Sequence, residues 1–206
     1  GLVVNKDKPE WIPIVSREPT NEVCSIEFDS LEGSKLQGAM RLKLSGIYRS
    51  RINKVLRYND SSELVKYLDI DENAEVTFNE KESDLNSTPM DLRFDISIQL
   101  EKFGNSYLLP SVIYDSMANN VLKEKKRRYP VNFPDSWSES YTCLVHLDSE
   151  KYSVNIPEQA NFALPDNGGK FSYMGSYNLG NLLIRNKVEL NKDTFEPIEY
   201  PVLRQF

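Results

Sequence analysis

The stretch LRFDISIQL, residues 92–100, alternates apolar and polar side chains without interruption. Leu92, Phe94 and Ile96 are separated by single polar residues, and successive side chains of a β-strand point to opposite faces of a sheet. This period of two predicts an antiparallel strand with one buried face and one face in water. The chain is therefore expected to be built around half-buried strands.

Two earlier segments, residues 22–28 and 36–44, show the same alternation and are also predicted to be strands. The Gly-containing loop between them is typical of a β-hairpin. After the second strand, the apolar spacing changes to that of a helix. Two short helices are therefore expected, near 47–58 and 61–69.

The second half of the chain is denser in strand signals, each bounded by Pro, Gly, Asn or Asp. The strands expected there are residues 138–147, 152–156, 161–164, 170–173 and 182–190. Short strands at this spacing favour a β-sandwich. The charge run KEKKRR at 123–128 is predicted to mark the boundary between the two halves of the chain. We predict an α+β fold, mainly antiparallel β, in which an N-terminal sheet unit with two short helices (1–126) is followed by a C-terminal β-sandwich (127–206).

The composition favours an ordered globular protein rich in sheet. The 206 residues include 11 Tyr and 9 Phe, and 39% of them are hydrophobic, which is enough to form a sizeable core. The formal net charge of -6 would repel nucleic acid and anionic membranes at long range, so either partner would require a local basic patch. No apolar run approaches the length of a membrane span, and no export signal is present. The start at Gly1 suggests an internal piece of a longer protein.

The stretch ALPDNGGKFSY, residues 163–173, can be interpreted as a phosphate cradle or as a turn. A cradle requires a glycine-rich loop that leads into a helix, whereas Phe171 and Tyr173 continue with the periodicity of a strand. Asn167, Gly168 and Gly169 readily adopt positive φ angles. We therefore predict a hairpin turn.

The loop that starts at Asp69 resembles a calcium-binding EF-hand, with oxygen-bearing residues at its first, third and fifth positions and Glu80 at the twelfth. Ala74 stands where the sharp turn needs glycine. The residues after it are typical of a strand, where an EF-hand continues into a helix. We predict a solvated loop between a helix and a strand, with no metal.

Candidate pairs of a nucleophile and a histidine base are few, because His146 is the only histidine. Cys143 lies three residues before it on a predicted strand, so the two side chains point to opposite faces and cannot form a catalytic pair. Cys24 lies on the apolar face of another predicted strand and is expected to be part of the core. The acidic residues could supply a carboxylate pair, but no spacing singles one out.

Two other features have a functional and a structural interpretation. The basic run at 123–128 could bind nucleic acid, but Glu124 interrupts it and no aromatic residues alternate with its charges, which favours a solvated linker. Trp11 and Trp137 could stack against sugars, although large aromatic side chains more often belong to a core.

Several strings in the second half stand out together. They are RYPVNFP at 128–134, ESYT at 139–142, YSV at 152–154, IPE at 156–158, LPDNGGKFSY at 164–173, VELNK at 188–192 and EYPVLRQF at 199–206. Together they resemble the carboxy-terminal region, a domain of unknown function, of bacterial transglutaminase-like proteins. Earlier, Gly46-Ile47-Tyr48 followed by Arg51 resembles the start of the helical segment that follows the catalytic core of those proteins.

This resemblance implies an order of domains. In the family, a β-rich domain comes first, a transglutaminase-like core with a Cys-His-Asp triad second, and the region that resembles this chain last. No position here matches the motifs of the triad. The resemblance thus implies a chain without catalysis, whose partner is the preceding core and whose location is periplasmic or extracellular.

The function expected from the sequence is that of a non-catalytic accessory or binding domain that follows a transglutaminase-like core. The alternative is a stand-alone carbohydrate- or peptide-binding module, whose ligand would be a peptide or a glycan. No catalytic, cofactor-binding or metal-binding residue is expected, and neither nucleic-acid binding nor membrane insertion.

Overall fold

The computed structural model describes residues 2–3, 10–11, 18–68, 70–114 and 122–206. The fold is mostly β, with few helices. The strands are β1 (Leu2–Val3), β2 (Glu10–Trp11), β3 (Thr20–Glu32), β4 (Lys35–Leu44), β5 (Ala74–Phe78), β6 (Met90–Gln99), β7 (Glu101–Phe103), β8 (Ser106–Leu108), β9 (Val131–Asn132), β10 (Trp137–His146), β11 (Ala160–Ala163), β12 (Gly169–Asn178), β13 (Asn181–Leu190) and β14 (Thr194–Phe195). The α-helices are α1 (Gly46–Tyr58) and α2 (Tyr200–Leu203), and the 3-10 helices are η1 (Ser61–Tyr67), η2 (Glu80–Glu82) and η3 (Pro165–Asn167).

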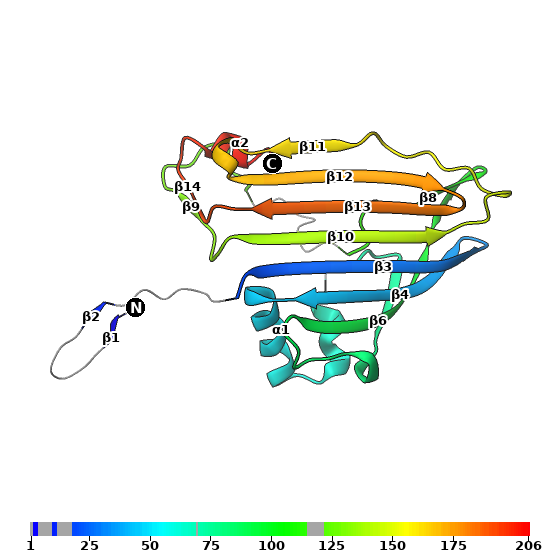
Figure 1. Cartoon of the computed structure of the whole chain (residues 1–206), viewed down its shortest axis with the longest axis horizontal. Helices are drawn as coiled ribbons and strands as arrows, with labels where there is room; N and C mark the ends of the chain where they lie inside the picture. Colours follow the sequence, from blue (N-terminus) through cyan, green and yellow to red (C-terminus); the bar gives the residue numbers. More distant parts are fainter. Residues whose placement is uncertain (1, 4–9, 12–17, 69, 115–121) are drawn as a thin grey trace.

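One large mixed sheet dominates the molecule (Figure 1). Its eight strands lie in the order β11-β12-β13-β10-β3-β4-β6-β5. All neighbouring strands are antiparallel except β10 and β3, which are parallel. The parallel pair joins strands from the two ends of the sequence, so the two predicted units contribute to a single continuous sheet.

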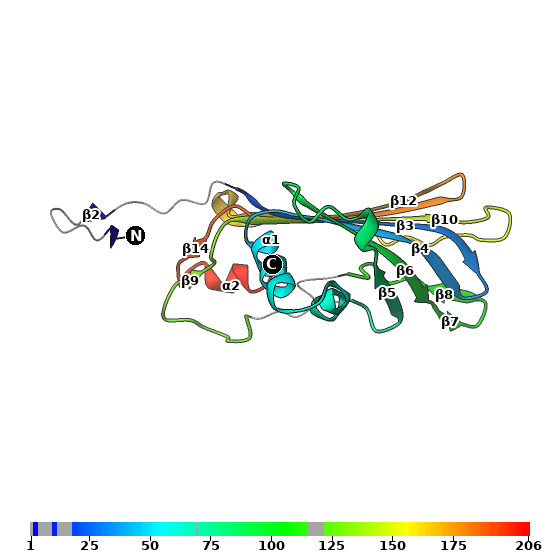
Figure 2. The same cartoon turned by 90° about the horizontal axis from the view of Figure 1, so that it is seen from below.

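The two faces of this sheet differ. On β3, Cys24, Ile26 and Phe28 are buried, whereas Ser25 and Glu27 between them are exposed. Figure 2 shows α1, η1 and α2 together on one side of the sheet. We call the covered side the inner face and the other side the open face. The alternation predicted for residues 92–100 has this cause, because apolar side chains of β6 face the helices and polar ones face away.

A hydrophobic core lies under most of the inner face. It combines side chains of β3, β4, β6, β10 and β13 with Ile52 of α1 and Leu64 of η1, both buried. A second, smaller core lies under one end of the sheet, where Leu190 of β13 packs with Phe195, Tyr200 and Leu203. The C-terminal helix is therefore fastened to the end of the sheet by apolar contacts.

The sequence predicted most of these elements. The hairpin of β3 and β4, helix α1, and strands β6, β10, β11, β12 and β13 are confirmed. The helix predicted at 61–69 is a 3-10 helix over Ser61–Tyr67, and Asp69 lies outside the described residues. The predicted strand at 152–156 is wrong, because that segment has no strand pairing. A β-sandwich is not confirmed, since the predicted sandwich strands lie side by side in one sheet.

The 152–156 segment shows why alternation alone can mislead. Tyr152, Val154 and Ile156 are half-buried, and Val154 and Ile156 pack against the main core. A side-chain alternation is thus present without a neighbouring strand to hydrogen-bond.

No helix among the described residues is long and apolar enough to cross a membrane.

Candidate functional site: the open face of the sheet

The open face carries a band of positive side chains across the middle of the sheet. In the strand register, Arg185 of β13 aligns through Thr142 and Ser25 with Arg41 of β4 and then with Arg93 of β6. Strands are about 4.8 Å apart, so Arg185 and Arg41, three strands apart, are separated by about 14 Å along the sheet.

The adjacent row has the same arrangement. Lys187 of β13 aligns through Ser140 and Val23 with Lys43 of β4. We call Arg41, Lys43, Arg93, Arg185 and Lys187 the cation band. Between its two halves lie small polar side chains and the exposed Val23, so the centre of the band is low and accessible.

Two acidic residues on the open face partly neutralise this band. The guanidinium of Arg41 donates two hydrogen bonds to Asp91, one of them from Nε to Oδ1 at 2.8 Å, and Arg93 Nε lies 3.4 Å from the same oxygen. The hydrogen bonds from Arg41 hold the pKa of Asp91 below its usual value. Lys187 forms an ion pair with Glu189 at 2.5 Å. Lys43 and Arg185 have no ion pair among the described residues.

Aromatic side chains avoid this surface. In the eight strands of the large sheet, every Phe, Tyr and Trp that the structure describes lies on the inner face, in phase with the buried positions: Phe28, Phe78, Phe94, Trp137, Tyr141, Phe162, Phe171, Tyr173 and Tyr177. Sugar-binding and single-strand nucleic-acid surfaces use exposed aromatic rings for stacking. The open face is instead suited to recognition of carboxylates by Arg and Lys.

Cys143 and His146 lie on opposite faces of the sheet, as their spacing on one strand predicted. Cys143 is buried on the inner face, and burial raises the pKa of its thiol to about 12. His146 lies on the open face, where its Nε2 is 3.0 Å from Glu27 Oε1 and its Nδ1 is 2.7 Å from Asn181 Oδ1. Cys24 is also buried, and burial raises its pKa well above the usual value. A thiol held in its protonated form is a poor nucleophile.

The structure brings together one pair of carboxylates that the sequence did not single out. Glu139 of β10 aligns with Glu22 of β3 in the parallel register, on the inner face. The hydroxyl of Tyr114 donates to Glu22 Oε2 at 2.9 Å, and the hydroxyl of Tyr48 in α1 donates to Glu139 Oε1. Burial raises the pKa of both tyrosines, so they stay protonated as donors. The pair thus connects α1 and the 113–114 segment to the junction of the two halves.

A signal for this pair is present in the sequence. Glu22 is in phase with Cys24 and Ile26, and Glu139 is in phase with Tyr141 and Cys143. Extending each apolar alternation by one step toward the start of its strand predicts a glutamate on the buried side. The pairing of β3 with β10, however, requires the tertiary structure.

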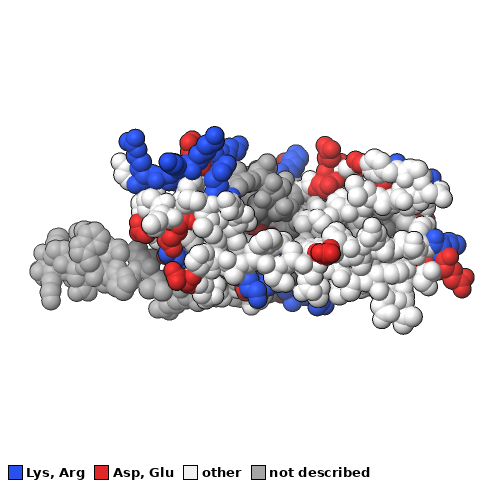
Figure 3. Space-filling view, turned by 90° about the horizontal axis from the view of Figure 1, so that it is seen from above, with Lys and Arg blue, Asp and Glu red and all other residues white. Residues whose placement is uncertain are grey.

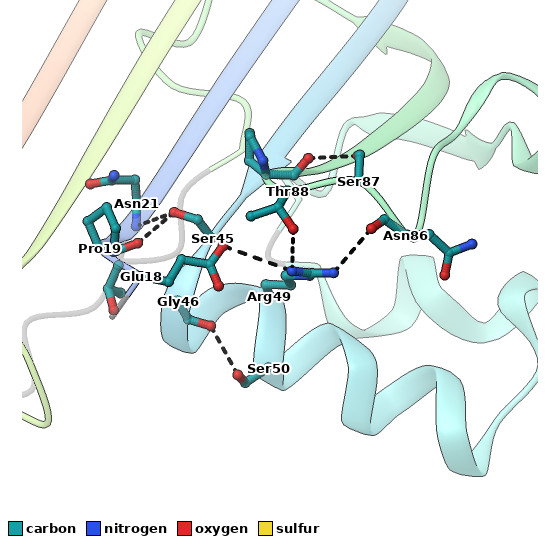
Figure 4. Close-up of polar contacts among 12 residues, drawn as sticks. Glu18, Pro19, Asn21, Ser45, Gly46, Arg49, Ser50, Asn86, Ser87 and Thr88 are labelled. Carbon is teal, nitrogen blue, oxygen red and sulfur yellow. Dashed lines mark hydrogen bonds and ion pairs between the residues drawn. The ribbon is translucent and has the colours of Figure 1, made fainter. Parts of the chain in front are cut away.

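A network of hydrogen bonds fastens α1 to the loop that precedes β6 (Figure 4). Arg49 of α1 donates from Nη1 to Thr88 Oγ1 at 2.8 Å and from Nη2 to the carbonyl oxygen of Asn86 at 3.4 Å. Just before the helix, Ser45 Oγ donates to the carbonyl oxygen of Pro19 at 2.6 Å. These contacts join α1 and the residue before it to two other segments of the chain.

The turn at 165–169 joins β11 to β12 as a hairpin, as predicted, through a single 3-10 turn. Positive φ occurs at Asp166 (52°) and Asn167 (55°), whereas Gly168 has φ -66°. The expected reason for the glycines was therefore wrong. They are needed for space, because a Cβ on Gly169 would lie 2.8 Å from the carbonyl oxygen of Glu189.

A polar pocket of about 500 Å³ lies beside this turn. It is lined by Asp135, Ser136, Asp166, Asn167, Asn191, Lys192 and Asp193. Asp135 accepts a hydrogen bond from Thr20 Oγ1 at 3.0 Å. Among the described residues, no three His, Cys, Asp or Glu side chains converge in a way that could hold a metal ion.

The Asp69 loop and the two tryptophans were the other candidates for a site. The loop after Asp69 leads into strand β5 at Ala74, as predicted, and Asp71 Oδ1 accepts a hydrogen bond from the backbone nitrogen of Asn73 at 2.8 Å. The side chain of Trp11 lies outside the described residues. Trp137 is half-buried against the second core.

Residues 104–206, half of the chain, match the family model described as "Domain of Unknown Function with solved-structure structure (DUF3858)". The chain belongs to this family. The expected resemblance to a domain of unknown function is confirmed, whereas the link to transglutaminase-like proteins stays a prediction. No curated protein and no solved structure matches the chain.

The DUF3858 segment supplies only some of the strands of the large sheet. It contains β10 to β13, and therefore Arg185 and Lys187 of the cation band. Arg41, Lys43 and Arg93 lie before it. The complete band thus depends on the parallel contact between DUF3858 and the preceding part of the chain.

Proposed function

We propose that this chain is a non-catalytic accessory domain of a bacterial, extracytoplasmic transglutaminase-like protein, and that it follows the Cys-His-Asp core of that protein. The strings that resemble the carboxy-terminal region of such proteins lie within the DUF3858 segment, apart from the weaker one at Gly46. The role of the domain is to bind a protein surface, namely an acidic region of the preceding core.

The observation that carries this proposal is the asymmetry of the sheet. Its inner face is packed against helices, whereas its open face presents the five cations of the cation band, of which Arg41, Arg93 and Lys187 contact acidic neighbours. Lys43, which lies opposite Asp91 in the register, and Arg185 form no ion pair among the described residues, and both are proposed to meet the acidic partner. Complementary charges across an interface orient the partner and speed its association.

The arrangement of the cysteines and the histidine supports a role without catalysis. Acyl transfer by a cysteine needs a thiolate and a base within hydrogen-bonding distance. Cys143 is buried and protonated, and His146 lies on the opposite face. The chain is therefore proposed to modulate or position an activity that belongs to the core.

One observation favours the alternative, a carbohydrate- or peptide-binding module. Phe162 of β11 and Phe171 of β12 stack with ring centroids 6.1 Å apart and an interplanar angle of 28°. Phe162 is 62% exposed, at the edge of the sheet. A sugar could stack on this ring, but one exposed ring offers a much smaller binding surface than the cation band.

The test begins with the parent reading frame, which should encode a Cys-His-Asp core upstream of Leu2. The absence of such a core contradicts the proposal. If it is present, the core and this chain are purified separately and titrated by calorimetry. The double variant Lys43→Glu with Arg185→Glu should raise Kd at least about tenfold, because it places two negative charges opposite an acidic partner.

The matched control reverses two other exposed cations, with Lys54→Glu and Arg57→Glu on α1. This variant has the same net charge as the open-face variant and should bind the core like the wild type. Equal weakening by both variants would show that only the overall charge matters. Tight binding of a glycan that depends on Phe162, without binding of the core, would support the alternative.

A further inference from the structure

The basic run at 123–128 forms a second positive surface, away from the open face. We call Lys123, Lys125, Lys126, Arg127 and Arg128 the basic patch; all five are exposed. Figure 3 shows Lys and Arg side chains gathered at one end of the molecule, where they project from the surface. None of the five forms an ion pair with a residue that the structure describes.

The C-terminal helix holds this run in place. The hydroxyl of Tyr200 donates to the carbonyl oxygen of Glu124 at 2.8 Å, and Arg204 Nε donates to that of Leu122 at 3.1 Å. The guanidinium of Arg127 lies over the ring of Tyr200, 5.4 Å from its centroid. Tyr200 is itself completely buried in the second core. The run is therefore exposed, as expected for a solvated linker, and it is also anchored to the second core.

Exposed apolar side chains accompany the basic patch. Tyr129, directly after it, is 80% exposed, and Ile198, just before α2, is 87% exposed. The two lie on neighbouring segments, because Val131 pairs with Phe195 in the short β9–β14 ladder. Cations around projecting apolar groups are typical of proteins that attach to the surface of an anionic bilayer, where Lys and Arg meet the headgroups and the apolar groups enter the interface.

We propose that the basic patch, with Tyr129 and Ile198, binds the surface of a membrane that contains anionic lipid. Binding is peripheral, and it is independent of the partner that the open face takes. A bilayer fits better than nucleic acid, because the five cations are not interleaved with rings on which bases could stack. Because the net charge is -6, attachment to an anionic surface requires a local concentration of cations, which the basic patch supplies.

The proposal is tested by sedimentation of the chain with vesicles. Vesicles of equal parts phosphatidylglycerol and phosphatidylcholine should bind the chain at low ionic strength, and phosphatidylcholine vesicles should not. Each cation near an anionic surface adds about fivefold to the partition coefficient, so Lys125→Glu with Lys126→Glu should lower it by at least about 25-fold. Raising the salt to 0.5 M should release the wild type.

The control is again Lys54→Glu with Arg57→Glu, which matches the charge change and should lower binding far less. Tyr129→Ala with Ile198→Ala should weaken binding without changing its salt dependence. Failure of the wild type to bind phosphatidylglycerol vesicles overturns the proposal, as does an equal loss in the control. Binding of a single-stranded oligonucleotide through the same lysines, without vesicle binding, overturns it in favour of nucleic acid.

Discussion

The inner and open faces of the sheet are formed by the same strands and yet have opposite properties. On β3, Ile26 and Phe28 are buried, whereas Val23 is 40% exposed and Ser25 and Glu27 lie in water. The inner side chains hold the layers together by burial of apolar area. The open side chains contribute little to that burial, so they are free to serve recognition.

The largest expected difference between the faces concerns stability. Leu42→Ala on β4 empties a fully buried site and should lower the free energy of unfolding by about 2–5 kcal/mol. Its neighbour Lys43 points to the open face, and Lys43→Ala should change that free energy by no more than about 0.5 kcal/mol. Urea unfolding of both variants measures the contrast. Similar losses in the two would show that the open face is also packed.

The second largest expected effect is on stability, at the hairpin between β11 and β12. Gly169 lies on the inner face, and a Cβ there would approach both the carbonyl oxygen of Glu189 and Leu164 Cδ1, the latter at 3.0 Å. Gly169→Ala should cost about 1–3 kcal/mol through overpacking. The control Asp166→Gly relieves a positive φ and should leave the urea midpoint unchanged or raise it. A wild-type midpoint for Gly169→Ala would contradict this explanation.

This hairpin also shows how far the sequence leads. PDNGG was sufficient to predict a turn, because these residue types tolerate unusual backbone angles. It could not show which residue takes them, since the tight approach of Gly169 to Glu189 depends on the pairing of β12 with β13. Local propensity thus predicted the element, and tertiary packing decided the role of each residue.

The same division applies to the strands and to the candidate sites. The alternation in β3, β4 and β6 predicted strands and their buried sides correctly, and β10 and β13 were also predicted as strands. The parallel contact of β3 with β10 could not be predicted, because it joins distant segments. The cation band and the Glu22–Glu139 pair both cross that contact. The sequence shows each of these residues, but it does not show which residues lie beside them on the neighbouring strand.

A smaller effect on the open face concerns Asp91. Its pKa is lowered by hydrogen bonds from Arg41, so its ionised form stabilises the folded state. This contribution is fully present above the pKa of an unfolded aspartate, about 3.9, and is lost as the pH falls through the lower folded value. Asp91→Asn should be less stable than the wild type at pH 7. The difference should shrink as the pH falls below about 3.9, as measured by urea unfolding at each pH.

An Asp91→Asn variant that keeps the same deficit at pH 2 and at pH 7 would contradict the ionic account of the Arg41 contact. Asp95→Asn is the matched control, because Asp95 lies on the same face of β6 and is exposed. It should show little difference from the wild type at either pH.

The smallest effect concerns His146. Hydrogen bonds with Glu27 and then with Asn181 raise its pKa above the usual value near 6.5. The stabilisation is present below that value and is lost as the pH rises through the raised folded pKa. Because the chain has 1 His, a proton NMR titration gives its pKa directly. Glu27→Gln should bring the pKa down toward 6.5, and an unchanged pKa would show that Glu27 does not contact the ring in solution.

The most direct measurement of the open face as a binding surface is lysine acetylation followed by mass spectrometry, with and without the transglutaminase-like core. We predict that the core slows the acetylation of Lys43 and Lys187 severalfold and leaves Lys125 and Lys126 in the basic patch unchanged. Unchanged rates at Lys43 and Lys187 under saturating core, or protection confined to the basic patch, would contradict the account.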